Sequence, residues 1–206
     1  MSDTVRIVEM SARDGLQNEK TPVSVADRID FIKALVGAGL NTVEVGAFVS
    51  PKAIPQMVGS DEVLRGVSRL PGEFHVLVPN EKGYQAARAA GAKVVSVFAA
   101  ASEGFSRANI NCSIAESIER FKPVVARARA DGVRIRGYIS TVLSPASTSF
   151  LTKAMRAAGL MGVFSFCRPS RGPISMIRTA SVMTLLQPVR PRRVRPPPAR
   201  YRRPCT

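Results

Sequence analysis

Along the first two thirds of the chain, short apolar runs alternate with longer segments in which apolar residues recur every three or four positions. The short runs are typical of buried β-strands, and the longer segments are typical of amphipathic α-helices. Strands are predicted at residues 5–10, 42–48, 74–78, 94–98 and 133–140. Helices are predicted at residues 25–38, 60–69, 81–90 and 113–130.

The helix boundaries carry local signals that agree with this pattern. Ser24 precedes the first predicted helix and can cap its start, while Gly39 and Gly91 follow two helices as natural C-caps. Strict alternation of strand and helix predicts a parallel sheet covered by helices, in an α/β fold. The alternation fits either an open doubly wound sheet or the first part of an eightfold barrel. No Gly-x-Gly-x-x-Gly follows any predicted strand, so dinucleotide binding has no support.

The alternation stops beyond Leu143. Residues 151–163 fit one weak helix, and residues 159–164 resemble the start of a strand at best. The net charge of the whole chain is +15, but residues 1–143 hold 18 basic and all 15 acidic residues, whereas residues 144–206 hold 12 basic residues and no acid. Nine of the 15 prolines also lie in the second part. We therefore predict two regions: a folded region at 1–143, and an Arg/Pro-rich region at 144–206 that is largely disordered.

The composition excludes several classes of protein. No run approaches the roughly 18 apolar residues of a membrane span. The N-terminal residues lack the basic-then-apolar pattern of a signal peptide, so we expect a cytoplasmic protein. The three cysteines are irregularly spaced and predict neither a disulfide framework nor a zinc motif.

The first candidate for chemistry is Arg13-Asp14-Gly15, where the first predicted strand gives way to a loop. Loops at the C-terminal ends of parallel strands carry the chemistry of α/β proteins. A carboxylate there can bind a hard divalent cation, and a neighbouring guanidinium can stabilise an oxyanion. The alternative is a surface loop with a weak local ion pair.

Other polar residues admit a structural and a functional interpretation. Glu44 alternates with apolar neighbours inside a predicted strand, so an ion-paired or functional role is expected, because an unpaired buried carboxylate is costly. His75 opens the third predicted strand at the end away from the site, and a packed or surface histidine is expected. Tyr138 fits a site or a core equally well. Asn109 and Asn111 are interpreted as turn and N-cap residues before the last predicted helix.

Several motifs in the same order resemble the 3-hydroxy-3-methylglutaryl-CoA lyase family. The Arg-Asp-Gly-Leu-Gln-Asn-Glu-Lys stretch at 13–20 and the Phe-Val-Ser-Pro-Lys stretch at 48–52 carry most of the resemblance. Shorter matching stretches occur at residues 55–57, 101–103, 109–113 and 136–138. The resemblance spans residues 4–143 and implies a metal-dependent (β/α)8 TIM barrel, represented here by about its first five strands. It implies carbon–carbon cleavage of an acyl-CoA to acetyl-CoA and acetoacetate, and a homodimer for the intact family.

Carried over by position, the resemblance also implies roles for individual residues. Asp14 would bind a divalent cation, Mg²⁺ or Mn²⁺, and Arg13 would stabilise the developing enolate. Glu44 would help to organise the metal and substrate end of the site. Gln17 and Lys20 would lie near the substrate, with Lys20 toward the anionic CoA portion.

Other features of the family are not found in this sequence. The family supplies further metal ligands from a His-x-His motif and a later asparagine, and a catalytic cysteine from a glycine-rich loop, whereas this chain has one histidine. We therefore hypothesise a frameshift near codon 143, and predict negligible lyase activity for this chain alone. Two alternatives stay open: a half-barrel whose basic tail binds nucleic acid nonspecifically, and a related aldolase or Claisen synthase.

Overall fold

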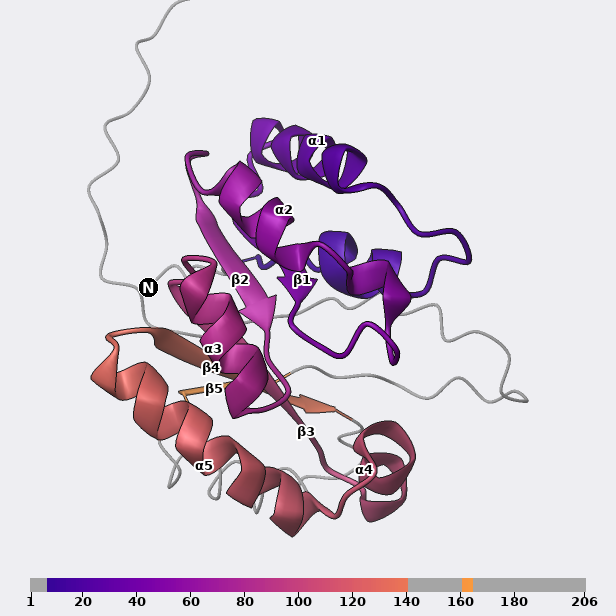
Figure 1. The fold of residues 1–206 in the computed structure, drawn as a ribbon, viewed down its shortest axis with the longest axis vertical. Helices are drawn as coiled ribbons and strands as arrows, with labels where there is room; N and C mark the ends of the chain where they lie inside the picture. Colours follow the sequence, from indigo (N-terminus) through magenta and orange to yellow (C-terminus); the bar gives the residue numbers. More distant parts are fainter. Residues whose placement is uncertain (1–6, 141–160, 165–206) are drawn as a thin grey trace, which may run out of the picture.

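A computed structural model of the chain describes residues 7–140 and 161–164. The strands of the described part form one five-stranded sheet in which every neighbouring pair is parallel. Their spatial order follows the chain order, so the sheet winds in one direction (Figure 1). A doubly wound sheet reverses its direction of winding and a (β/α)8 barrel does not, so this order favours the barrel type. The strands are β1 Thr42–Ala47, β2 Glu73–Leu77, β3 Val94–Ala100, β4 Arg134–Ser140 and β5 Met161–Phe164.

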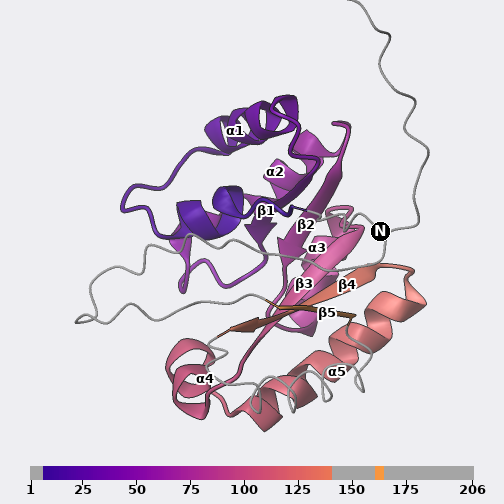
Figure 2. The same cartoon turned by 180° about the vertical axis from the view of Figure 1, so that it is seen from behind.

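Helices connect β1 to β2, β2 to β3 and β3 to β4. α2 and α3 stand in front of the strands in Figure 1 and behind them in the reverse view of Figure 2, and α5 runs along the lower side of β3 and β4 in both views. Within the described residues, no helix combines the length and apolar character needed to cross a membrane. The α-helices are α1 Val25–Gly37, α2 Ser60–Val67, α3 Glu81–Ala89, α4 Glu103–Ile110 and α5 Ile114–Ala130. Two short elements are the π-helical turn η1 Ser11–Gly15 and the 3-10 turn η2 Pro55–Met57.

The two faces of the sheet have different compositions. Val43 and Val45 of β1 point into the main apolar core between the sheet and the helices. Because successive side chains of a strand point to opposite faces, Glu44 between them faces the other side. There it joins polar groups from the neighbouring strands. The pleat of β1 therefore places a single carboxylate on the face opposite the main core.

The C-terminal end of β1 is held by a buried arginine from α1. Arg28 is fully buried and donates from Nη1 to the Val58 carbonyl at 2.8 Å and from Nη2 to Ser60 Oγ at 3.3 Å. Ser60 Oγ also accepts from the Ala47 N–H at 3.2 Å. The register of β1 against β2 shifts between Glu44 and Gly46, directly before this contact. The strand thus reaches the site through an irregular segment that α1 and α2 hold in place.

Most predicted elements are confirmed, together with their boundary signals. The Ser24 hydroxyl accepts from the Asp27 N–H and caps α1. Gly39 and Gly91 both adopt φ of +92°, the left-handed conformation expected at helix ends. The strand predicted at 133–140 is β4, and the helix predicted at 113–130 is α5 with Ser113 as its cap.

The prediction of a strand at residues 5–10 is wrong for its described part. Glu9 makes one parallel bridge to Val43, through bonds of 2.8 Å to the backbone of Thr42 and of Glu44. At Met10 the chain already turns into η1, which replaces the loop predicted around Arg13. A turn that begins directly after the bridge leaves no length for a strand. Residues 5 and 6 lie outside the described residues.

One helix was missed and two asparagines were placed wrongly. α4 contains Asn109, and Asn111 ends it in the left-handed conformation, with φ of 49°. Asn111 is therefore a C-cap, and Ser113 is the N-cap of the next helix through a capping box. The start of α4 could have been predicted from Ser102 and Glu103, because a serine cap followed by an acidic residue is typical of the first turn of a helix.

The described structure contains four residues of the region 144–206. They form β5, which pairs in parallel with β4 and confirms the strand prediction at residues 161–164. Residues 151–160 of the predicted helix lie outside the described residues. The predicted disorder of the remaining tail falls outside the described residues.

Candidate active site

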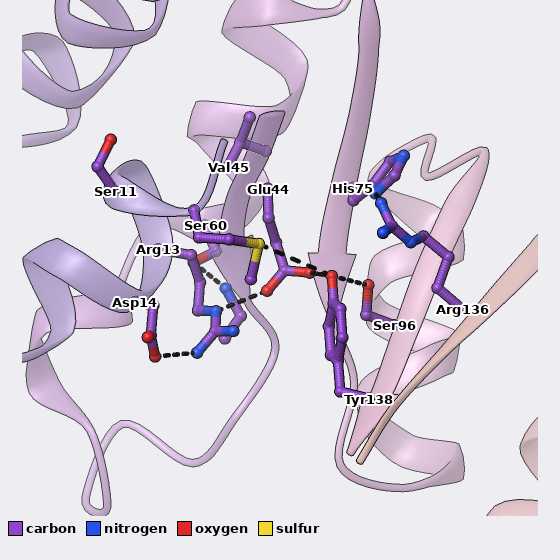
Figure 3. A network of polar contacts seen from close by, with 12 residues as sticks. Ser11, Arg13, Asp14, Glu44, Val45, Ser60, His75, Ser96, Arg136 and Tyr138 are labelled. Atoms are coloured by element: carbon purple, nitrogen blue, oxygen red, sulfur yellow. Dashed lines mark hydrogen bonds and ion pairs between the residues drawn. The ribbon is translucent and has the colours of Figure 1, made fainter. Parts of the chain in front are cut away.

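η1 brings two charged side chains to the edge of β1. The Asp14 N–H donates to the Met10 carbonyl at 2.7 Å and the Gly15 N–H reaches the same carbonyl at 3.4 Å, which closes the wide turn. Arg13 is 9% exposed and points toward β1 (Figure 3). Its Nη1 donates to Asp14 Oδ1 at 2.7 Å, and its Nε donates to Glu44 Oε1 at 2.6 Å. One guanidinium thus joins the two acidic residues that the sequence singled out.

Glu44 is fully buried, and each of its oxygens has a donor. Oε1 accepts from Arg13, and Oε2 accepts from the Tyr138 hydroxyl of β4 at 2.5 Å. Burial alone would raise the pKa of Glu44, but the charge of Arg13 and the hydrogen bonds from Tyr138 and Arg13 outweigh burial and hold it below its ordinary value. Glu44 is therefore an ionised partner of Arg13. A fully paired buried carboxylate of this kind explains how the strand tolerates a charge.

The same contacts fix the charge of Arg13 and the neutrality of Tyr138. Burial would lower the pKa of Arg13, but Glu44 and Asp14 raise it above its ordinary value, so the guanidinium stays protonated. Burial and the adjacent Glu44 raise the pKa of Tyr138 far above its ordinary value. Tyr138 is accordingly a neutral hydrogen-bond donor to Glu44.

Sequence reasoning left Tyr138 undecided and missed Ser96. Tyr138 is 4% exposed and is both a core residue and a site residue. Its ring packs with Val8 and Met10, and its hydroxyl donates to Glu44. Ser96 of β3 is fully buried, and its Oγ donates to the Tyr138 hydroxyl at 3.2 Å. The sequence did contain a signal for Ser96, because this serine stands in the middle of an otherwise apolar predicted strand. The same observation singled out Glu44.

His75 is packed, as expected, although it lies in the middle of β2 rather than at its start. It is 1% exposed, with Nε2 at 2.5 Å from Glu73 Oε1 and Nδ1 at 2.8 Å from Arg136 Nη1. Since a guanidinium can only donate, Nδ1 must accept and the proton must reside on Nε2. Burial lowers the pKa of His75, and the charge of Arg136 lowers it further. The guanidinium of Arg136 also lies 5.7 Å from the Tyr138 ring centre.

Of the three predicted substrate-binding residues, Arg13 contacts Glu44, whereas Gln17 and Lys20 are not part of this contact. Gln17 follows η1, and its buried Oε1 has no hydrogen-bond partner in the part of the chain that the structure describes. Lys20 is exposed further along this segment. A donor from Gln56 to the Glu19 carbonyl, at 3.1 Å, ties the segment to η2. The structure therefore places Gln17 and Lys20 on one surface segment beside η1.

A metal would find few ligands among the described residues. No three His, Cys, Asp or Glu side chains of this part converge on one point. Asp14, with 27% of its side chain exposed, is the accessible carboxylate, whereas both oxygens of Glu44 are occupied. The Asp14 carboxylate is therefore suited to bind a hard cation, whereas Glu44 is suited to orient Arg13.

Fold and site together define a class of protein. A unidirectional parallel sheet is of the (β/α)8 barrel type, and a buried arginine held by two carboxylates beside its first strands can stabilise a developing negative charge. The HMGL-like family model matches residues 4–188. The chain belongs to the HMGL-like family, which is generally metal-dependent.

Individual relatives agree with this assignment. A 3-hydroxy-3-isohexenylglutaryl-CoA/hydroxymethylglutaryl-CoA lyase of Pseudomonas aeruginosa is 58% identical over 140 residues, which are 68% of this chain and 47% of the relative. The hydroxymethylglutaryl-CoA lyase of Pseudomonas mevalonii is 56% identical over 140 residues, which are 68% of this chain and 46% of the relative. The chain thus spans about half the length of these relatives.

Solved structures give the same result. The hydroxymethylglutaryl-CoA lyase of Pseudomonas aeruginosa superposes with a TM-score of 0.75 at 48% identity, covering 80% of this chain and 57% of that one. A lyase from Acinetobacter baumannii, solved with coenzyme A and 3-methylmalate, superposes with a TM-score of 0.73 at 29% identity, covering 78% and 55%. These matches confirm the TIM-barrel type of fold.

Proposed function

We propose that this chain carries the N-terminal part of the active site of a hydroxymethylglutaryl-CoA lyase. The reaction is the cleavage of 3-hydroxy-3-methylglutaryl-CoA to acetyl-CoA and acetoacetate. The observation that supports it best is the Arg13 guanidinium, which is buried, permanently charged and aimed by Glu44 and Asp14. The relatives of this chain by sequence are lyases that act on hydroxymethylglutaryl-CoA or a similar acyl-CoA.

Arg13 has the chemistry that the cleavage step requires. Breaking the carbon–carbon bond leaves negative charge on the thioester oxygen of the departing acetyl-CoA enolate. A guanidinium held in place before the reaction stabilises that charge without reorganisation. Removing one such donor costs about 10²–10³ in rate in other enzymes. Glu44 contributes by holding the donor in place, since a loose arginine would lose part of this advantage.

Asp14 is the residue that would hold the divalent cation, Mg²⁺ or Mn²⁺. When bound, the cation supplies Lewis-acid polarisation of substrate oxygens. One carboxylate from this chain is a weak site by itself, so the remaining ligands must come from residues outside the described part or from a complete barrel. Gln17 and Lys20 are proposed to contact the acyl-CoA, Lys20 through its charge. A homodimer is proposed for the complete enzyme.

The test is a chimera in which residues 1–143 of this chain are joined to the C-terminal part of the Pseudomonas aeruginosa relative. The chimera is expected to release acetoacetate from 3-hydroxy-3-methylglutaryl-CoA in a cation-dependent manner, and Arg13→Met should lower kcat by at least about 10²-fold. The 206-residue chain alone is expected to show negligible release. A folded chimera without activity would contradict the proposal, and activity only on other acyl-CoA or keto-acid substrates would favour a related aldolase or Claisen synthase.

A second candidate function rests on the charge of residues 144–206. Twelve basic residues without an acid favour nonspecific, salt-sensitive binding to nucleic acid or another polyanion. The assay is a gel shift with unrelated DNA at increasing salt, for the whole chain and for a chain ending at Leu143. Equal binding by the two forms would exclude the tail as the cause.

A further inference from the structure

We propose that Ser96 is a positioning residue of this site, which acts through Tyr138 and Glu44 to hold Arg13. The catalytic role that this inference gives to Ser96 rests on the proposed function. The test measures stability and does not depend on that function. Ser96 lies on β3, two strands away from β1, and does not contact Arg13 in the described structure (Figure 3). Its effect must therefore pass through the side chains between them.

The directions of the hydrogen bonds follow from the number of protons. A serine and a tyrosine hydroxyl carry one proton each, and an ionised carboxylate carries none. Ser96 Oγ donates to the Tyr138 oxygen at 3.2 Å, so the single proton of Tyr138 is left for Glu44 Oε2 at 2.5 Å. Arg13 Nε donates to the other oxygen at 2.6 Å. Tyr138 and Arg13 thus each donate to one oxygen of Glu44, and Ser96 supports the Tyr138 donor from behind.

Burial makes the loss of any one of these hydrogen-bond donors costly. Ser96 and Glu44 are fully buried and Tyr138 is 4% exposed, so water cannot replace a missing donor at little cost. The Ser96 hydroxyl also helps to lower the pKa of Glu44. Without it, the Tyr138 oxygen loses its donor, the Tyr138–Glu44 hydrogen bond is less strongly polarised, and Glu44 loses part of the stabilisation that keeps it charged. A less firmly ionised Glu44 attracts Arg13 more weakly.

Other charged and titratable groups surround Glu44, and all of them are still present when Ser96 is substituted. They come from each element packed against the carboxylate. These groups are Arg13 and Asp14 of η1, His75 of β2, and Arg136 and Tyr138 of β4. Their contributions to the pH dependence cancel when Ser96→Ala is compared with the unmodified chain.

The experiment measures unfolding of the full 206-residue chain in urea, followed by far-UV circular dichroism, at a series of pH values from about 7 to about 3. At neutral pH, Ser96→Ala should lower the folding equilibrium constant about tenfold, since a hydrogen bond that supports a charged group is lost. The loss should shrink below about threefold as the pH falls through the folded-state pKa of Glu44, which lies below its ordinary value of 4.5, because protonated Glu44 no longer needs the donors.

The matched control is Ser106→Ala. Ser106 is also fully buried and donates to a backbone carbonyl, that of Cys112 at 2.8 Å, but it lies outside the Glu44 network. Its loss should be constant across the pH range. In a Glu44→Gln background, the pH-dependent part of the Ser96→Ala effect should disappear.

A Ser96→Ala loss as independent of pH as that of Ser106→Ala would overturn the inference. So would a pH-dependent loss that persists in the Glu44→Gln background, or an unmodified chain without a cooperative transition at neutral pH. None of these measurements uses lyase activity. A failure of the chimera assay with the expected pH behaviour would refute the proposed reaction and leave the role of Ser96 intact.

Discussion

Removing Arg13 should destabilise the fold far more than removing an ordinary surface charge. In Arg13→Met the Glu44 carboxylate stays fully buried and keeps only the Tyr138 hydroxyl as a strong donor. At an effective dielectric constant near 20, two unit charges about 4 Å apart attract by about 4 kcal/mol. Breaking a buried pair by removing one partner costs roughly 3–5 kcal/mol. We expect Arg13→Met to lower the free energy of unfolding by about this amount at neutral pH.

The assay is a double-mutant cycle measured by urea unfolding. Glu44→Gln keeps the shape of the side chain and the acceptor for Tyr138 but removes the charge, and its cost is expected to be about 2–4 kcal/mol. The double variant Arg13→Met/Glu44→Gln no longer buries an unpaired charge, so its cost should fall short of the sum by about 2 kcal/mol or more. Additive losses would refute the reasoning, since they would mean that the two side chains do not depend on each other.

The pH dependence gives a second check on the same pair. The folded-state pKa of Glu44 is lowered, so its contribution to stability is present above the ordinary value of 4.5 and is lost as the pH falls through the folded-state value. The cost of Arg13→Met should therefore decrease in acid. Asp30→Asn serves as control, because the Lys33–Asp30 pair is exposed and removing it should cost under about 1 kcal/mol at any of these pH values.

Three further predictions concern other positions. Because burial lowers the pKa of His75, stability should fall as the pH drops below its ordinary value of 6.5, and His75→Gln should flatten this part of a pH–stability curve measured by thermal unfolding. Gly46→Ala should destabilise by about 1–3 kcal/mol in urea unfolding, since the new Cβ would lie 2.6 Å from Oγ of the buried Ser60; an unchanged midpoint would show that Ser60 moves freely. Tyr84→Phe should cost about 1 kcal/mol in the same assay by removing the 2.7 Å bond to Asp131. Burial and the bond to Asp131 raise the pKa of Tyr84 to about 12, so an alkaline titration of tyrosine absorbance should lose its step near pH 12 in Tyr84→Phe.

The sequence was sufficient for most of the fold because its signals are local. Alternating strand and helix patterns, and caps such as Ser24 and Gly39, depend on residues a few positions apart. The errors occurred where the local pattern was misleading or short. The apolar run at residues 5–10 looks like a strand, but a turn at Met10 leaves a single bridge. α4 is short and was hidden between two stronger elements.

The candidate site could be predicted only in part. Arg13 and Asp14 were found from their place after an apolar run, and Glu44 from the cost of a carboxylate among apolar residues. The family resemblance implies that Glu44 helps to organise the metal and substrate end, and this stays a prediction. The described contacts of Glu44 are with Arg13 and Tyr138. A strand pattern tells which face a side chain occupies, but it does not tell which residue of a neighbouring strand stands opposite.

By itself, the sequence determined the parallel α/β class, the compositional boundary near Leu143, and the motif that holds Arg13 and Asp14. The tertiary structure decided the partners of Glu44, which lie 31 and 94 residues away along the chain at Arg13 and Tyr138. It also decided that Ser96 joins them across β3 and β4. The physical reason is that burial removes water from competition, so the charge state of Glu44 is set by whichever donors the sheet register brings within reach.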